Sequence, residues 1–372
     1  MIYTIPDYYK EFKCIADKCE DTCCAGWQIV IDEASKNRYK KVRGNFMWRM
    51  FCSVDWINGV FRQDEQKRCA FLNEQNLCDL YTACGEKSLC KTCKQYPRHI
   101  EEFEGVREIT LSISCPEVAR ILMARKAPVE FLSYEKEGEE EYEDFDPFLF
   151  SILEDARKEM IEILQNRTLP VRTRAMLVLG MAHDMQGRIN RQEMFDCFGV
   201  MEKYRSKSAL DFVQEYLKDK KWNVTIAQNL YDKQYELELL REEWDMLLQE
   251  SEVLLYGKGD VAYKILREEF AGWAKENSDI AIHLEQLLVY FLFTYFPGAV
   301  YDGEIYAKVQ MAVYCTWMIY ELWMAKWLKN EKCLDEEEMT DLVYRFSREV
   351  EHSDVNLKRI EKMMEQKLFL LP

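Results

Sequence analysis

Residues 14–27 read CIADKCEDTCCAGW, and residues 69–98 read CAFLNEQNLCDLYTACGEKSLCKTCKQYPR. With the short block SCPE at residues 114–117, these stretches dominate a cysteine-rich region, and eleven of the 14 cysteines lie in the first 115 residues. Thiols gathered this closely indicate a metal site, a disulfide framework or redox chemistry. The spacing Cys90-x2-Cys93 favours a metal, because a tight turn can present both sulfurs to one ion.

The composition narrows the classes of partner. The chain has 372 residues, a formal charge of −16 and 48% hydrophobic residues, which are values typical of a globular protein of two or three domains. Nucleic acid and anionic membranes both require a basic footprint, so the acidic excess argues against them. The same excess suits a cationic partner, or it serves only to keep the protein soluble.

No secretory signal is visible in the sequence. It does not open on a cationic start followed by an apolar run, as a secretory signal would. Its most apolar run, LLVYFLFTYF at residues 287–296, is about half of the ~20 residues that a membrane span needs. We therefore expect a cytoplasmic protein without a membrane partner, and in a reducing cytosol clustered cysteines are metal ligands or catalytic groups more often than disulfides.

The apolar pattern predicts a mainly α fold: an irregular cysteine-rich N-terminal module with a small β-hairpin, followed by a multi-helix domain. Strand alternation is clear only in residues 107–114, REITLSIS, and Glu104-Gly105 would turn a hairpin from residues 100–103. A helix is expected to begin at Pro116, because proline is tolerated at the first helical position.

The acidic run EKEGEEEYEDFD divides the chain into three predicted parts. These are a metal-binding, iron–sulfur domain at 1–134, a solvated acidic linker at 135–146, and an α-helical domain at 147–372. Within the last part, residues 309–328 are apolar nearly all round and predict a central buried helix. Further helix starts are expected at Pro170, Asn190, Asp260, Ser278, Asp335 and Asp354.

The cysteines leave two metals open. Iron–sulfur clusters and zinc sites both use thiolates. The chain has only four histidines, and this shortage argues against a zinc site of mixed Cys and His ligands but not against one of four cysteines. Five cysteines outside the regular blocks are expected to be small buried hydrophobes instead. They are Cys52, Cys84, Cys197, Cys315 and Cys333.

The cysteine-rich part of the chain resembles the flagellin lysine-N-methylase family in its pattern CIADKCEDTCCAGWQIVID, then CAFL…LCDLY…GEKSLCKTCKQYPR, then SISCPEVARIL. A later stretch is similar to the helical C-terminal region of the same family: HLEQLLVYFLFTYFP, at residues 283–297. The resemblance implies methyl transfer from S-adenosylmethionine to lysine side chains of flagellin, or of another lysine-bearing protein. It also implies a 4Fe–4S cluster. The matching cysteines are Cys14, Cys19, Cys23, Cys24, Cys69, Cys78, Cys90, Cys93 and Cys115.

Methylation of a lysine sets chemical requirements. The ammonium must first lose a proton, so we expect Tyr96 or Asp21 as the catalytic group, although either could instead be a packing tyrosine or a turn aspartate. Trp27 is a candidate to hold the cofactor by cation–π attraction, with Trp48 and Trp56 as alternatives, although each could instead be a packing residue. Arg98 is the other candidate cofactor-binding residue, since it belongs to the matching Tyr-Pro-Arg motif.

Two features bear on the alternatives. No G-x-G-x-x-G follows a strand, so an S-adenosylmethionine site would have to be built on helices or on the cluster. The non-enzymatic alternative is a binding or scaffold protein that structural zinc, or an iron–sulfur cluster, staples together. Iron with sulfide in near-equal amounts would favour the enzyme, and stoichiometric zinc the scaffold.

Overall fold

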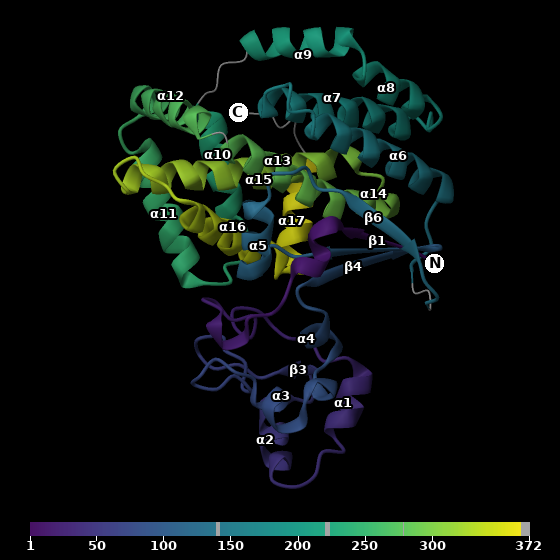
Figure 1. Ribbon diagram of the computed structural model, residues 1–372, viewed down its shortest axis with the longest axis vertical. Helices are drawn as coiled ribbons and strands as arrows, with labels where there is room; N and C mark the ends of the chain where they lie inside the picture. The colour runs from purple at the N-terminus through teal and green to yellow at the C-terminus, as the bar shows by residue number, and fades with distance from the viewer. Residues whose placement is uncertain (139–141, 220–223, 278, 366–372) are drawn as a thin grey trace.

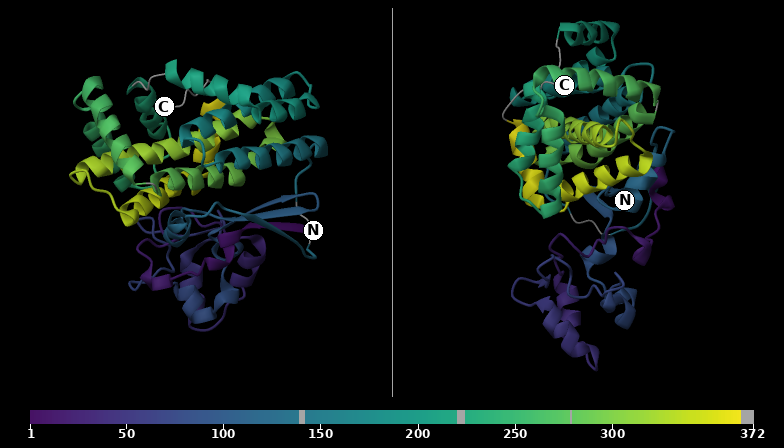
Figure 2. Two further views of the ribbon diagram at one scale, coloured as in Figure 1. Left: turned by 45° about the horizontal axis from the view of Figure 1, so that its top comes forward. Right: turned by 90° about the vertical axis from the view of Figure 1, so that its left-hand side faces the viewer.

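The computed structural model describes residues 1–138, 142–219, 224–277 and 279–365. It consists of a large helical body with a β-sheet on its underside and a small irregular module below the sheet (Figures 1 and 2). The predicted mainly α fold class is therefore confirmed.

The small module holds short elements joined by long loops, and we call it the cysteine module, residues 13–97. Glycines and polar side chains shape these loops, and Asp32 caps the first helix by accepting from the Ser35 amide at 2.8 Å. Its elements are the 3-10 turns η2 (Ala16–Lys18) and η3 (Glu86–Ser88), the helices α1 (Glu33–Tyr39), α2 (Phe46–Ser53), α3 (Asp79–Cys84) and α4 (Lys91–Gln95), and the strands β2 (Val54–Asp55) and β3 (Val60–Phe61).

The sheet has four strands in the order β4-β5-β1-β6, from β1 (Ile2–Pro6), β4 (Arg98–Phe103), β5 (Val106–Leu111) and β6 (Phe131–Glu135). The predicted hairpin is present as β4 and β5, turned at Gly105, whose φ of 69° favours glycine. The sequence did not reveal β1, which pairs in parallel with β5 and antiparallel with β6. The cysteine module is thus an excursion of the chain between two sheet strands.

The helical body buries the largest hydrophobic core. The 3-10 turn η1 (Asp7–Glu11), α5 (Pro116–Ala124) and the sheet pack against it from below. The other helices are α6 (Pro147–Leu164), α7 (Val171–Asn190), α8 (Asp196–Tyr204), α9 (Lys207–Asp219), α10 (Val224–Tyr235), α11 (Glu242–Tyr256), α12 (Asp260–Glu276), α13 (Asp279–Tyr295), η4 (Phe296–Gly298), α14 (Ala299–Asp302), α15 (Ile305–Lys329), α16 (Glu336–Glu351) and α17 (Asp354–Glu365).

Strong local signals predicted several helices correctly. Pro116 opens α5, the apolar stretch at 309–328 lies in the buried helix α15, and Asp335 forms a capping box with Glu338 at the start of α16. Asn190 was predicted wrongly, since it ends α7 rather than beginning a helix. The expected start at Ser278 lies outside the described residues.

The cores divide the chain differently from the three predicted parts. Residues from before and after the acidic segment share the large core, whereas the cysteine module has a second core of its own, which includes Cys69 and Cys90. The division at 1–134, 135–146 and 147–372 therefore stays a prediction. One stretch, Asp279–Asp302, is long and apolar enough to cross a membrane, but most of it is buried inside this core.

Three of the cysteines predicted to be buried are exposed. Cys197 and Cys315 lie in the core as expected, but Cys52, Cys84 and Cys333 face solvent. The two in the module sit at the ends of the short helices α2 and α3, where too little chain packs over them to cover a side chain. Cys333 lies in the loop between α15 and α16.

Glu321 carries a testable consequence of this core. It is fully buried in α15 and accepts hydrogen bonds from Tyr256 (3.1 Å) and Tyr263 (3.0 Å). Burial raises its pKa to about 7, so the folded protein binds a proton that the unfolded chain releases at lower pH. The protonated form of Glu321 is therefore the one that the folded protein favours. The stability that this preference gives is fully present below the ordinary glutamate pKa and is lost as pH rises through 7.

Glutamine cannot lose a proton, so we expect the free energy of unfolding of Glu321→Gln, minus that of the wild type, to increase from pH 5 to pH 8. The expected increase is up to about 3 kcal/mol. Urea unfolding of both proteins at the two pH values measures this difference. An equal difference at both pH values would contradict the assignment.

Candidate functional site

A cavity of about 750 Å³ lies between the cysteine module and the helical body. The module contributes parts of its first cysteine block and of the loop before Cys69, and the body contributes the start of α11 and one face of α16. The lining residues are Glu20, Asp21, Thr22, Ala25, Gly26, Glu65, Gln66, Lys67, Arg68, Leu239, Leu240, Arg241, Glu242, Glu243, Trp244, Leu247, Tyr344, Arg345, Arg348 and Glu349.

The module wall is made of two loops that hold each other by main-chain hydrogen bonds. The Gly26 amide donates to the Lys67 carbonyl at 3.1 Å, and the Cys69 amide donates to the Cys24 carbonyl at 2.8 Å. The Lys67 ammonium in turn donates to the Leu240 carbonyl of the helical body at 2.7 Å. The two cysteine blocks thus form one surface that faces α11 and α16.

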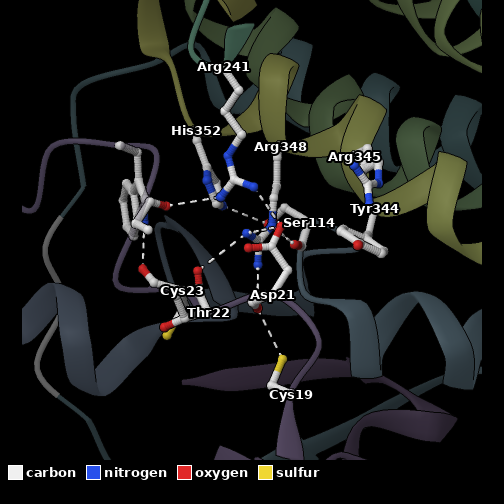
Figure 3. Close-up of polar contacts among 12 residues, drawn as sticks. Cys19, Asp21, Thr22, Cys23, Ser114, Arg241, Tyr344, Arg345, Arg348 and His352 are labelled. Carbon is white, nitrogen blue, oxygen red and sulfur yellow. Dashed lines mark hydrogen bonds and ion pairs between the residues drawn. The ribbon is translucent and has the colours of Figure 1, made fainter. Parts of the chain in front are cut away.

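Arg348 of α16 joins the two bodies. Its side chain is 2% exposed, and its guanidinium donates to the carbonyls of Ser114 (2.9 Å), Thr22 (3.3 Å) and Asp21 (2.9 Å). It also pairs with the Asp21 carboxylate at 2.7 Å, as Figure 3 shows. A buried cation needs such partners, so the first cysteine block is fixed to the helical body at this point.

Arg241 reaches Asp21 from the other side. It pairs with the same carboxylate at 2.6 Å and donates to the Ala25 carbonyl at 3.2 Å. Gly26 makes room for it, because a Cβ there would lie 2.5 Å from the Arg241 Nε. Gly26 also has a φ of +87°, a conformation that side chains disfavour.

Trp27, Tyr96 and His352 form an aromatic cluster beside this clamp. The Trp27 ring stacks on His352 at 4.7 Å and contacts Tyr96 at 5.8 Å, and its indole N–H donates to the Cys23 carbonyl at 2.8 Å. His352 Nε2 lies 3.0 Å from the Ser114 hydroxyl. Burial holds the pKa of His352 well below its ordinary value, so the imidazole is neutral at physiological pH.

The predicted catalytic residues occupy this region, but their contacts are those of supporting groups. Asp21 is the acceptor of two arginines. Tyr96 is partly buried, with its hydroxyl 3.2 Å from that of Ser114, and desolvation raises its pKa well above the ordinary value, so its phenol keeps its proton. Neither environment favours a group that removes a proton, and both catalytic roles stay predictions.

The predicted cofactor-binding residues are separated. Trp27 lies in the aromatic cluster, beside the cavity wall. Arg98 on β4 instead donates to the Tyr9 hydroxyl at 2.9 Å and lies over the rings of Tyr9 and Phe12. Its known contacts are therefore with the N-terminal segment that packs on the helical body.

All the cysteines are free thiols, and most of the predicted ligands converge. Six lie close enough for each to act on the pKa of another: Cys23, Cys24, Cys69, Cys78, Cys90 and Cys93. Cys19 and Cys115 also lie near enough to Cys23 for its charge to act on their pKa values, whereas Cys14 is exposed.

The thiols suit a metal chemically. In Cys90-x2-Cys93 the Cys93 thiol donates to the Cys90 sulfur, which lowers the pKa of Cys90 and raises that of Cys93. Burial raises the pKa of Cys69 to about 12, so a cation would have to stabilise its thiolate. In the part of the chain that the structure describes, however, no group of three or more His, Cys, Asp or Glu side chains is placed to hold a metal ion.

Sequence reasoning missed the residues that the helical body brings to the cavity and to the aromatic cluster beside it. Arg241, Arg348, Glu349 and His352 lie far along the chain from the cysteine blocks. One signal was present: Glu349 follows Leu342 and Phe346 at helical spacing, and it is 3% exposed. A glutamate on an apolar stripe requires a reason.

Comparisons with known proteins identify the larger part of the chain. Residues 157–371 match the family model described as the FliB lysine N-methylase C-terminal domain. A flagellar biosynthetic protein FliU from Salmonella muenchen is 28% identical over 129 residues, which cover 32% of this chain and 76% of FliU. No solved structure matches the chain.

Two relatives carry the name lysine-N-methylase. The protein from Salmonella typhimurium is 28% identical over 130 residues, and the protein from Salmonella choleraesuis matches equally. In each case the match covers 32% of this chain and 32% of the relative. The chain thus spans about a third of the length of the methylases it matches.

The close approach of Gly26 to Arg241 can be tested with a matched pair of variants. Gly44 has a similar φ of +79°, but nothing lies within 4 Å of its added Cβ. Gly44→Ala is expected to cost about 1–2 kcal/mol for the left-handed backbone alone.

Gly26→Ala is expected to cost about 1–3 kcal/mol more, because Arg241 must leave the Asp21 carboxylate. Urea unfolding of the two variants measures this difference. Equal losses would show that the clamp does not depend on the space at Gly26.

Proposed function

Because the chain belongs to the FliB lysine N-methylase family, we propose that it is a protein-lysine N-methyltransferase that uses S-adenosylmethionine and acts on flagellin. One observation supports the proposal above the others. The domain that matches the family supplies one wall of the cavity, through Arg241, Arg348 and Glu349, and the first cysteine block supplies the other wall. A reaction at this cavity would use residues of both the cysteine module and the helical body.

The charges around the cavity suit a lysine substrate. Four exposed carboxylates line it, those of Glu20, Glu65, Glu242 and Glu243. A lysine ammonium would be attracted to this rim, and the overall charge of −16 would favour its approach over a longer range. The FliU relative is named for flagellar biosynthesis and two others for lysine methylation, and these names support flagellin as the substrate.

Basic and aromatic groups could receive the methyl donor. Lys67, Arg68 and Arg345 line the same cavity, and their charges would favour the carboxylate of the methionine part of S-adenosylmethionine. When bound, S-adenosylmethionine supplies a methyl group on a sulfonium. Trp27 stands beside the module wall, where an aromatic ring attracts a sulfonium or a methylated ammonium.

We further propose that the converging thiols hold a 4Fe–4S cluster. An iron–sulfur cluster takes about four thiolates, and the six thiols of the module offer more than enough donors. The pair Cys90 and Cys93 has the spacing of metal ligands, and Cys24 and Cys69 lie near enough to Cys93 to raise the pKa of its thiol. When bound, the cluster would tie the loops of the module together and supply Lewis-acidic iron.

The methylation proposal has a direct test. The protein, purified without oxygen and incubated with isotope-labelled S-adenosylmethionine and purified flagellin, is expected to add labelled methyl groups to flagellin lysines. Peptide mass spectrometry locates them, and flagellin with acetylated lysines is the control. No label on any lysine, with the metal content of the protein intact, would overturn the proposal.

The metal proposal has its own test. The wild type is expected to contain iron and sulfide in near-equal amounts, and the double variant Cys90→Ser/Cys93→Ser is expected to lose most of both. Cys333→Ser, which changes an exposed cysteine in the helical body, is expected to keep them. Stoichiometric zinc with no iron, or equal iron in all three proteins, would overturn it.

A further inference from the structure

One carboxyl group of the cavity differs from all the others that line it. Glu349 is 3% exposed, whereas the rim carboxylates are exposed and Asp21 is committed to Arg241 and Arg348. Among the described residues no cation forms an ion pair with Glu349. It therefore lines the cavity as a buried acid whose charge is not already neutralised by a bound partner.

The position of Glu349 is fixed from both sides. Its Oε2 accepts from the Leu240 amide at 2.8 Å, and its main-chain carbonyl accepts from the fully buried Asn356 side chain at 2.7 Å. The Arg241 amide also faces the carboxyl group. A group held in this way keeps one orientation at the cavity wall, as a proton acceptor in catalysis must.

The charged groups around Glu349 leave it able to titrate near neutrality. Burial raises its pKa to about 7, while the amide of Leu240 and the cations Arg241 and Lys67 oppose the rise. On its own helix, Arg345 is paired with Asp341 and Arg348 with Asp21. A carboxyl group in this range can take up a proton and release it again at physiological pH.

We infer that Glu349 is the general base of the methyl transfer, an inference that rests on the proposed function. The Glu349 carboxylate takes one proton from the ε-ammonium of the substrate lysine, which frees the nitrogen lone pair. That nitrogen forms a bond to the methyl carbon of S-adenosylmethionine as the carbon–sulfur bond breaks. The products are methylated lysine, which carries the positive charge, and neutral S-adenosylhomocysteine, and Glu349 then returns its proton to solvent.

The test is Glu349→Gln, which keeps the shape and can still accept from the Leu240 amide. At pH 7 the methylation rate is expected to fall about 100-fold or more, because general-base catalysis typically contributes that much. The rise of the wild-type rate with pH through about 7 is expected to disappear, and activity is expected to recover toward pH 10, where lysine loses its own proton. Binding of a lysine-bearing flagellin peptide is expected to change little.

Two controls separate this role from a structural one. Glu321→Gln changes a buried carboxyl group of similar pKa that lies outside the cavity, and it is expected to keep the wild-type rate and pH profile. Unfolding of Glu349→Gln at pH 5 and pH 8 provides a readout independent of activity. Since the Glu349 carboxyl loses its proton as pH rises, the variant is expected to gain stability over the wild type across this range.

The outcomes are distinguishable. A folded wild type that methylates no lysine refutes the proposed function. A wild type that methylates lysine, beside a Glu349→Gln variant with the same rate and the same pH profile, refutes the role of Glu349 and leaves the proposed function standing. A variant that loses peptide binding together with its rate also refutes the role as a base, because a base acts after the substrate has bound.

Discussion

The buried guanidinium of Arg348 is the group on which the arrangement of this protein most depends. A cation with almost no access to water must be met by oxygens on every side. Here the oxygens come from the first cysteine block, through Asp21 and Thr22, and from the segment after β5, through Ser114. One side chain of α16 therefore fixes where the cysteine module stands against the helical body.

The cavity follows from this contact. Arg348 and Arg241 share the Asp21 carboxylate, so the loop of the cysteine module is held at a set distance from α11 and α16 rather than packed against them. Fixed polar walls on both sides give a space in which charged groups keep their positions without rearranging, which is the condition for electrostatic catalysis. The cysteine module and the helical body have separate cores, and they meet in a polar site.

Much of the fold could be predicted because its signals are local. The apolar stretch of α15, the proline that opens α5 and the capping box of α16 are each read from neighbouring residues. Strand β1 could not be predicted, because its partner residues on β5 and β6 lie about a hundred positions away. The site could not be predicted in full for the same reason. Asp21 was identified, but its role depends on Arg241 and Arg348, which are 220 and 327 positions further along the chain.

The excursion of the cysteine module between β1 and β4 also sets an order of assembly on the ribosome. All the thiols of the module are synthesised before α16, and at typical translation rates the delay is on the order of ten seconds or more. During that interval the partners of β1, strands β5 and β6, are already synthesised, but Arg348 is not yet available to the first cysteine loop. The contact between this loop and the helical body therefore closes only after α16 has been made.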